Sequence, residues 1–213
     1  MLPACVLFDL DGTLIDHFKA IHRCHTYAMT RLGLPAPTMT QVRAAVGGGL
    51  DEAITKLAGA HRVAEILPIY TAHFDATHLD DVELLPGARE LLETLDRAGV
   101  VCAVLTNKRG YASREVCDHL GLTPLLRGVF GVHDTPWLKP DPAFTRHALT
   151  ALGAAAESTL LVGDSPFDVK TAKNAGLGFI GVTTGTHDEP QLRHAGAARV
   201  CAGLPEVSRE LGL

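Results

Sequence analysis

Asp9 and Asp11 stand two positions apart in the sequence DLDGT, directly after the apolar run Cys5–Phe8. Residues two apart on an extended segment point the same way, so these carboxylates can face a common space. Carboxylates that close repel each other, and a bound cation is the simplest compensation at neutral pH. The pattern therefore predicts a metal site, whereas the alternative is a plain Asp-Gly turn at the end of a strand.

Two more acidic residues follow a second apolar run, Leu160–Val162, in the sequence GDSPFD. Helix capping accounts for much of this segment, because Ser165 fits an N-cap, Pro166 a first helical position and Asp168 the acidic partner of a capping box. Capping does not require Asp164. We therefore predict that Asp164 is a metal ligand and that Asp168 is a second acidic contact or an orienting residue of the same site.

Three more polar side chains stand near the ends of other predicted strands. Thr106 and Asn107 follow the run Val100–Leu105, where they could cap a helix start or donate hydrogen bonds to phosphate oxygens. Lys139 stands in the sequence LKPDP, in which Asp141 fits the N-cap of the next helix and the lysine is left on a stiff, proline-flanked loop. Taken alone, Lys139 would be a solvated surface lysine.

The apolar runs around these residues indicate buried strands, which we expect at Cys5–Phe8, Val100–Leu105, Val129–Val132, Leu160–Val162, Phe179–Val182 and Arg199–Cys201. Helical periodicity lies between them, at Ala88–Ala98, Gly110–Leu120, Ala143–Leu152 and Pro166–Ala175. Strands that are apolar throughout and alternate with helices are typical of a parallel sheet covered on both faces. The expected fold class is therefore α/β, a doubly wound parallel sheet whose carboxyl edge carries all four polar groups.

One segment interrupts this alternation. From Asp16 to Leu84 the sequence has helical periodicity, punctuated by glycine and proline, and no convincing strand. We therefore expect residues 16–84 to form a helical insertion, and residues 1–15 and 85–213 to form the core domain. Within the insertion, the glycines at positions 47–49 either allow close approach to a small ligand or form a plain turn between helices.

The composition excludes several classes of protein. With 46% hydrophobic and 20% charged residues among 213, the chain should be ordered and globular. Its net charge of −5 is not gathered into runs, which argues against nucleic acid and membranes as partners. Residues 1–5 lack the features of a signal peptide, so we expect a cytoplasmic protein. The five cysteines, without a CxxC pair, should be reduced and mostly buried, and the eleven histidines should lie at the surface and its boundary.

Together these motifs resemble the four motifs of the haloacid dehalogenase-like hydrolases, which here are Asp9-Leu10-Asp11-Gly12-Thr13, Thr106-Asn107, Lys139-Pro140 and Gly163-Asp164 with Asp168. The insertion, Leu85-Pro86-Gly87 and the segment 139–142 are most similar to the phosphoglycolate phosphatase group. The resemblance implies a Rossmann-like core with an inserted α-helical cap domain. It also implies a Mg²⁺-dependent phosphatase of small phosphorylated metabolites, such as phosphoglycolate or a sugar phosphate.

The resemblance also implies a role for each motif. Asp9 would be the nucleophile that forms an aspartyl-phosphate, and Asp11 would protonate the leaving alkoxide and then activate water. Mg²⁺ would be held by Asp9, the Asp11 backbone carbonyl and Asp164, with Asp168 in its outer coordination. Phosphoryl oxygens would contact Thr106, Asn107 and Lys139.

Other functions use related residues. A β-phosphoglucomutase-like phosphomutase of the same fold would pass the phosphoryl group to a sugar hydroxyl, and a phosphate-accepting signalling module would hold it without turnover. Dehalogenases that resemble this fold lack an aspartate at the place of Asp11, so its presence favours phosphate over halide. We expect a small-molecule phosphomonoester as partner and a monomer or homodimer as the state of assembly.

The start of the insertion departs from the family pattern. After Asp16, many relatives that resemble this chain have a small hydroxyl residue, whereas this chain has His17 and Phe18. We expect this bulky pair to narrow or reshape the substrate space.

Overall fold

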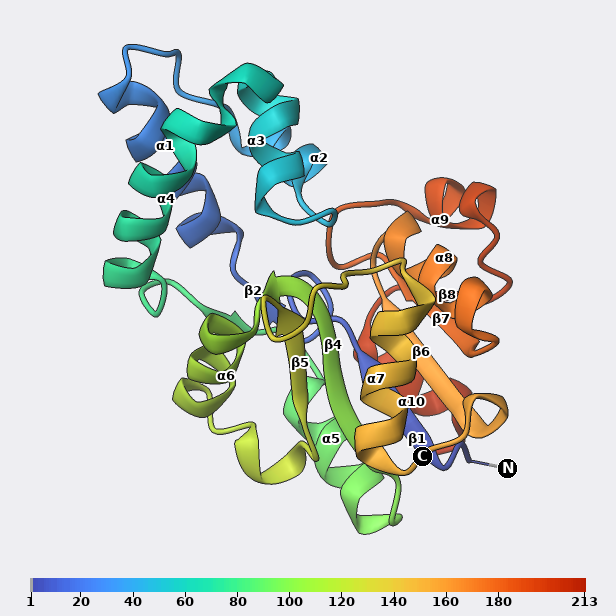
Figure 1. Cartoon of the computed structure of the whole chain (residues 1–213). Coiled ribbons are helices and arrows are strands. Elements are labelled where there is room, and N and C mark those ends of the chain that lie inside the picture. Colours follow the sequence, from blue (N-terminus) through green and yellow to red (C-terminus); the bar gives the residue numbers. More distant parts are fainter. Residues whose placement is uncertain (1) are drawn as a thin grey trace.

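The computed structural model describes residues 2–213, and its centre is a six-stranded parallel sheet (Figure 1). The strands lie in the order β5 (Val129–Val132), β4 (Val101–Arg109), β1 (Cys5–Phe8), β6 (Thr159–Gly163), β7 (Gly178–Val182) and β8 (Val200–Cys201). All neighbouring pairs are parallel. The predicted doubly wound α/β fold and its six strands are confirmed.

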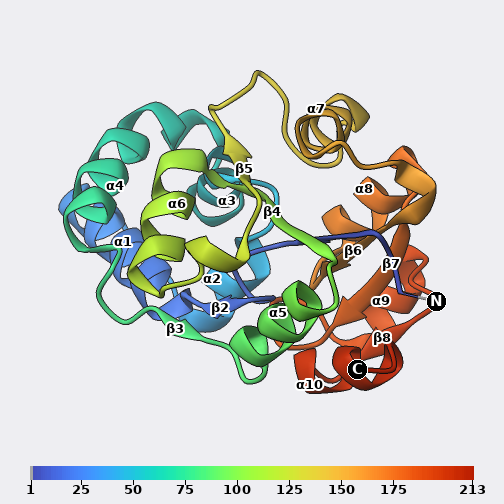
Figure 2. The same cartoon turned by 90° about the horizontal axis from the view of Figure 1, so that it is seen from below.

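Helices cover both faces of this sheet (Figure 2). The face toward which Val6 and Phe8 point packs against α5 (Ala88–Arg97), α6 (Gly110–His119) and α10 (Leu204–Glu210). The opposite face, with Cys5 and Leu7, packs against α7 (Pro142–Leu152) and α8 (Pro166–Ala175), and α9 (Glu189–Ala195) packs on α8. Two short 3₁₀ turns, η2 (Thr123–Leu125) and η3 (Ala156–Ser158), precede β5 and β6. Both faces of the sheet are thus removed from water, as its continuously apolar strands require.

The insertion, residues 16–84, lies beyond the carboxyl ends of the strands (Figure 1). It consists of α1 (Phe18–Arg31), α2 (Met39–Ala45), α3 (Leu50–Ala58), the turn η1 (Ala60–Arg62) and α4 (Val63–Thr77). Its helices share an apolar cluster distinct from those of the sheet. This cluster also includes Ala112 of α6 and is built from Cys24, Ala28, Met29, Ile54, Ile66, Tyr70, Phe74 and Ala112.

The two connections to the insertion pair with each other. Ile15–Asp16 (β2) and Glu83–Leu84 (β3) form a two-stranded antiparallel ribbon. The expectation of no strand between residues 16 and 84 is therefore wrong at both ends of the segment. Strands of two residues are too short to show an alternating pattern in the sequence.

Several local predictions hold. Asp141 is the N-cap of α7 and accepts a hydrogen bond from the Ala143 N–H at 2.8 Å. All five cysteines are free and buried. The histidines are not all peripheral, because His17, His25 and His78 are buried.

Among residues 2–213, the structure has no helix that is both long and apolar enough to span a membrane.

Candidate active site

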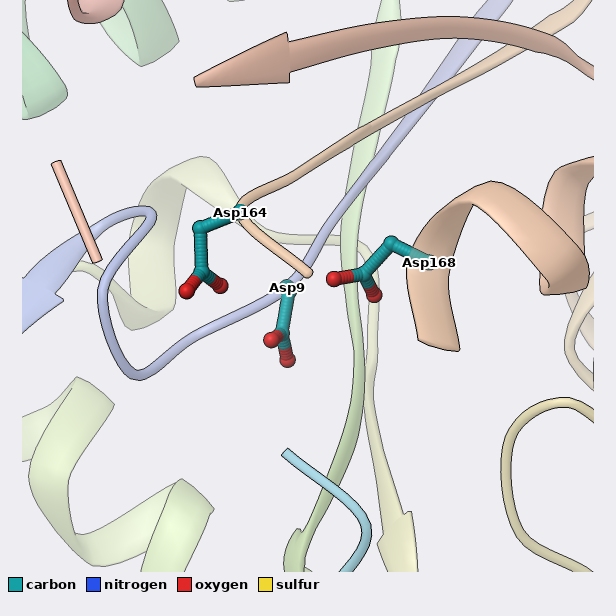
Figure 3. Close-up of side chains that lie close together, drawn as sticks. All are labelled: Asp9, Asp164 and Asp168. Carbon is teal, nitrogen blue, oxygen red and sulfur yellow. The ribbon is translucent and has the colours of Figure 1, made fainter. Parts of the chain in front are cut away.

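Three carboxylates meet at the carboxyl edge of the sheet (Figure 3). Asp9 follows β1 and Asp164 follows β6, and these strands are neighbours that end in register at Phe8 and Val162. Asp168 reaches the same place from the first turn of α8. One oxygen of each carboxylate lies within 4.8 Å of the other two, and all three residues are buried. The structure thus places side by side three of the acids that the sequence predicted for one site.

The protein compensates the negative charge of these three carboxylates only in part. Asp9 Oδ1 is buried and accepts no hydrogen bond from the residues that the structure describes. Burial raises the pKa of Asp9 to about 6, although the Lys139 charge acts in the opposite direction. Burial, reinforced by the charges of Asp9 and Asp168, raises the pKa of Asp164 to about 8. A hard divalent cation with oxygen ligands, such as Mg²⁺, fits this donor set, because it would supply the missing positive charge and coordinate an oxygen that accepts no hydrogen bond.

Lys139 is a buried member of this cluster, so the surface-lysine alternative is wrong. Its Nζ donates a hydrogen bond to Asp168 Oδ1 at 2.6 Å and lies 2.9 Å from Asp9 Oδ1, without the angles of a hydrogen bond. Burial alone would lower the pKa of Lys139, but the charges of Asp168 and Asp9 outweigh it and hold that pKa above its usual range. Lys139 is therefore an ammonium ion, fixed beside the predicted nucleophile.

Asp168 orients this lysine and also begins α8. Its Oδ2 accepts hydrogen bonds from the Ser165 N–H at 3.1 Å and from Ser165 Oγ at 2.6 Å, within the predicted capping box. Both Asp168 oxygens are thus engaged by the protein, one by Lys139 and one by Ser165.

Thr106 and Asn107 lie inside β4, which continues to Arg109, so the helix-capping alternative for them is wrong. The apolar run ends at residue 105, but the strand continues to residue 109. An extended backbone can carry polar side chains where a strand reaches the edge of the sheet. Asn107 Oδ1 accepts from the Lys139 N–H at 2.7 Å, and its Nδ2 donates to the Lys139 and Gly47 carbonyls, each at 3.0 Å. Asn107 therefore fixes the loop of Lys139 and contacts the insertion.

The carboxylate of Asp11 is held away from this three-acid cluster. Both of its oxygens accept from Lys108 Nζ at 3.0 Å, and His17 Nδ1 lies 3.4 Å from Oδ1. Burial alone would raise the pKa of Asp11, but the Lys108 charge outweighs it and holds that pKa well below its usual range. Lys108 was missed in the sequence, where its only signal is its position directly after Asn107.

The ring of His17 is a second hydrogen-bond partner of Lys108. Its Nε2 donates to the His78 carbonyl, so its Nδ1 is the acceptor for Lys108 Nζ at 2.9 Å. Burial and the Lys108 charge keep the pKa of His17 below its usual value, which favours this neutral form. His17 and Phe18 do not line the cavity described below, so they do not narrow the substrate space by direct contact, and their reshaping of it stays a prediction. Phe18 instead packs under the Arg43 guanidinium, 4.0 Å from its ring centre.

A loop after β7 holds Asp164, and sequence reasoning missed it. Asp164 Oδ2 accepts from Thr186 N at 2.7 Å and from Thr186 Oγ1 at 2.8 Å. A Cβ on Gly185 would lie 2.0 Å from the same oxygen, so this approach requires glycine. Gly12, at φ +83°, also packs closely on this loop. A Cβ on Gly12 would lie 2.7 Å from the Cα of Gly185. The glycine of the DLDGT motif thus serves both the turn and the close packing around Asp164.

A cavity of about 830 Å³ lies between the insertion and the carboxyl edge of the sheet. Asp9, Asp11, Asp164, Thr106 and Asn107 line it from the core. The glycines at positions 47–49 form the turn between α2 and α3 and line the cavity from the insertion, and their close approach to a ligand stays a prediction. The cavity gives a small molecule direct access to the carboxylates.

Comparisons with known proteins identify the family of this chain. A family model described as haloacid dehalogenase-like hydrolase matches residues 6–182. A phosphoglycolate phosphatase from Cereibacter sphaeroides is 33% identical over 215 aligned positions, which cover 97% of this chain and 98% of the relative. A 5′-nucleotidase from Pseudomonas aeruginosa is 31% identical over 208 positions, covering 97% and 94%.

Solved structures share the fold. A haloacid dehalogenase-like family protein from Streptococcus pneumoniae superposes with a TM-score of 0.89 at 24% identity, over 98% of each chain. From the sequence motifs, the matched family model and these relatives together, the chain belongs to the haloacid dehalogenase-like hydrolases, and within them it is similar to the phosphoglycolate phosphatases.

Proposed function

We propose that this protein is a Mg²⁺-dependent phosphatase that hydrolyses small phosphomonoesters through an aspartyl-phosphate on Asp9. The observation that carries the proposal is the Asp9 carboxylate, which lines a substrate-sized cavity. Its Oδ1 accepts no hydrogen bond among the described residues and lies 2.9 Å from the buried Lys139 ammonium, beside two further carboxylates. Relatives named for phosphatase activity on small phosphate esters support it.

Asp9 provides the nucleophile. Its carboxylate attacks phosphorus, the bond from phosphorus to the ester oxygen breaks, and the alkoxide leaves with a proton from Asp11. In the second step, water loses a proton to Asp11 and attacks phosphorus. Inorganic phosphate then leaves and the Asp9 carboxylate is restored.

The metal site uses the same carboxylates. Asp9, Asp164 and the Asp11 backbone carbonyl would hold Mg²⁺, and Asp168 would lie in its outer coordination while it orients Lys139. When bound, Mg²⁺ supplies positive charge that offsets the repulsion between these carboxylates and a phosphate dianion.

Positive charge and hydrogen-bond donors come from the protein as well. The Lys139 ammonium stabilises charge on the transferring phosphoryl group. Thr106 Oγ1 accepts from the Lys108 N–H and keeps its own O–H free to donate to phosphate. Both N–H bonds of the Asn107 amide are already used, so Asn107 contributes by holding the backbone of Lys139.

Lys108 determines the charge state of Asp11. In the substrate-free geometry Asp11 is ionised, which suits its role as base in the second step. A phosphate dianion in the cavity competes for the Lys108 ammonium, and this weakens the hold on Asp11 and favours its acid form.

The insertion acts as a cap domain over this site. Residues 16–84 cover the carboxyl edge of the sheet and contribute part of the cavity wall. In this position they exclude bulk water from the first step and contact the part of the substrate beyond the phosphate.

Phosphate release from a panel of small phosphoesters tests the proposal. We expect turnover with Mg²⁺ that stops in EDTA, and no turnover by Asp9→Asn. Asp96→Asn, an exposed aspartate on α5, is the matched control and should keep full activity. Turnover by pure Asp9→Asn protein would contradict the assignment. Isomerisation of hexose 1-phosphates without phosphate release would favour the phosphomutase, and a long-lived phosphoprotein without turnover would favour the signalling module.

A further inference from the structure

The cavity offers far more room than a two-carbon phosphate ester requires. Its volume of about 830 Å³ lies in the upper part of the range of about 300–1,000 Å³ that is typical of pockets for much larger small molecules. The space beyond the phosphate site must therefore be filled by a sizeable leaving group or by water. The residues that line this space indicate whether a leaving group or water fills it.

Aromatic rings from three separate segments line it. Tyr70 and Phe74 of α4 are buried and stacked, with ring centres 5.7 Å apart. Tyr111 of α6 and Trp137 of the loop after β5 also line the cavity, although 38% and 37% of their surface is exposed to solvent. Large rings exposed within a concave site are typical of surfaces that bind flat apolar groups.

The cavity has no spare cation for an acidic leaving group. Within the described residues, its lysine and arginine side chains are Lys108 and Arg109, and each is already paired with a carboxylate. Lys108 binds Asp11 at 3.0 Å, and Arg109 lies 3.3 Å from Asp75 and stacks over the Tyr111 ring. A carboxylate on the leaving group would lose its hydration without gaining an ion pair, which is unfavourable.

His25 offers an uncharged hydrogen bond instead. It lines the cavity, is only 1% exposed, and its Nδ1 has no hydrogen-bond partner among the described residues. Its ring packs on Tyr70, with centres 4.5 Å apart. Burial, with a smaller contribution from His22, lowers the pKa of His25 to about 4, so the imidazole is neutral near pH 7. A buried polar atom of this kind calls for a neutral hydroxyl, carbonyl or ring nitrogen on the ligand.

We propose that the preferred substrate is a phosphomonoester whose leaving alcohol is uncharged and carries a flat ring, with the ring bound at Tyr111 and Trp137 and a polar group bound at His25. This inference rests on the phosphatase function proposed above. It sets this chain apart from a phosphatase selective for phosphoglycolate, whose leaving group is small and carries a carboxylate.

Two matched pairs of esters test the two parts of the inference on the wild-type protein with Mg²⁺. Adenosine and uridine 5′-monophosphate are compared with ribose 5-phosphate, which has the same ester linkage but no ring. We expect kcat/KM to be roughly tenfold higher for at least one nucleotide. 2-Phosphoglycolate is compared with 2-hydroxyethyl phosphate, in which a neutral group replaces the carboxylate, and the neutral ester should be the better substrate.

Three variants test where the ring of the substrate binds. Trp137→Ala should lower kcat/KM for the nucleotide by about fivefold and leave ribose 5-phosphate within about twofold of wild type. Tyr27→Ala removes an equally exposed ring of α1 outside the cavity, so it should change neither. His25→Phe keeps a ring against Tyr70 but removes the nitrogen, and should raise KM for the nucleotide alone. Thermal unfolding of each variant verifies that it is folded.

The outcomes separate the two proposals. If small esters are hydrolysed and ribose 5-phosphate matches the nucleotides, or if phosphoglycolate exceeds its neutral analogue, the inference on substrate class is overturned and the phosphatase remains. If no ester releases phosphate, both are overturned. A loss of nucleotide selectivity in Tyr27→Ala equal to that in Trp137→Ala would also contradict the placement of the ring.

Discussion

Lys108 holds both carboxylate oxygens of Asp11, each 3.0 Å from Nζ, and is itself held by the ring of His17. His17 directly precedes α1, and its other nitrogen bonds to the His78 carbonyl, just after α4. Asp11, the general acid and base of the proposed mechanism, is thus connected through Lys108 and His17 to both ends of the insertion. The chain of hydrogen bonds from Asp11 to the insertion passes through one lysine.

Removing the Lys108 charge should change the pH profile. Because Lys108 keeps the pKa of Asp11 low, Lys108→Gln raises that pKa, and Asp11 then loses its base form at a higher pH than in wild type. We expect the acidic limb of kcat to shift upward and kcat to fall by about 10². A pH–rate profile measures both effects, with the exposed Lys173→Gln as control. An unchanged acidic limb would contradict the role given to Lys108.

Replacing His17 should affect stability and turnover together. His17→Phe preserves much of the volume but leaves the His78 carbonyl and the Lys108 ammonium without a partner. We expect the free energy of unfolding to fall by roughly 1–3 kcal/mol and kcat to fall more than KM changes. Denaturant unfolding and steady-state kinetics provide the readouts. The same substitution at the exposed His194 should leave both unaltered, and equal losses at the two positions would count against this assignment.

Breaking the buried ion pair of Asp168 and Lys139 should lower both stability and kcat. Asp168→Asn removes the carboxylate 2.6 Å from the ammonium, and we expect a loss of about 3 kcal/mol in stability and of about 10² in kcat. Glu189→Gln breaks the exposed pair with Arg193, which has a similar N···O distance of 2.7 Å, and should cost about 0.5 kcal/mol or less. Thermal unfolding compares the two, and similar losses would show that burial does not strengthen the inner pair.

The stabilisation by Mg²⁺ should depend on pH. In the metal-free fold the pKa values of Asp9 and Asp164 are raised to about 6 and about 8, above the value near 3.9 of an unfolded aspartate. The folded state therefore binds more protons than the unfolded state between about pH 4 and 8, and stability from these groups is lost as pH rises through that window. Added Mg²⁺ offsets this loss, so the increase in Tm should be larger at pH 8 than at pH 5.

Asp164→Asn provides the control for this measurement. The substitution removes the group with the larger shift, and most of the pH dependence of the Mg²⁺ effect should disappear with it. A Tm increase that is the same at both pH values in wild type would contradict a cation site among these carboxylates.

The sequence predicted those parts of the site that depend on strand ends. Asp9 and Asp164 follow apolar strands that are neighbours in the sheet, so one local pattern and one topological rule place both acids. Asp168 also stands in a local segment with a clear capping signal. Such positions are set by short stretches of chain.

The remainder of the site depends on contacts between distant segments. Lys108 meets His17 only because the insertion returns to the core, and in the sequence each has the character of a surface residue. Likewise, Trp137 and Tyr70 share one cavity although no local pattern relates them. Such contacts are set by tertiary packing, which neither spacing nor periodicity expresses.

Asn107 joins the core to the insertion through one side-chain amide. Its Nδ2 donates to the Gly47 carbonyl of the insertion, and its two hydrogen bonds to the Lys139 backbone lie within the core. The contact with the insertion and the contacts that fix the Lys139 backbone are therefore separate hydrogen bonds. Loss of the bond to Gly47 would leave both bonds to Lys139 in place, so the two parts of the structure share a residue without sharing a bond.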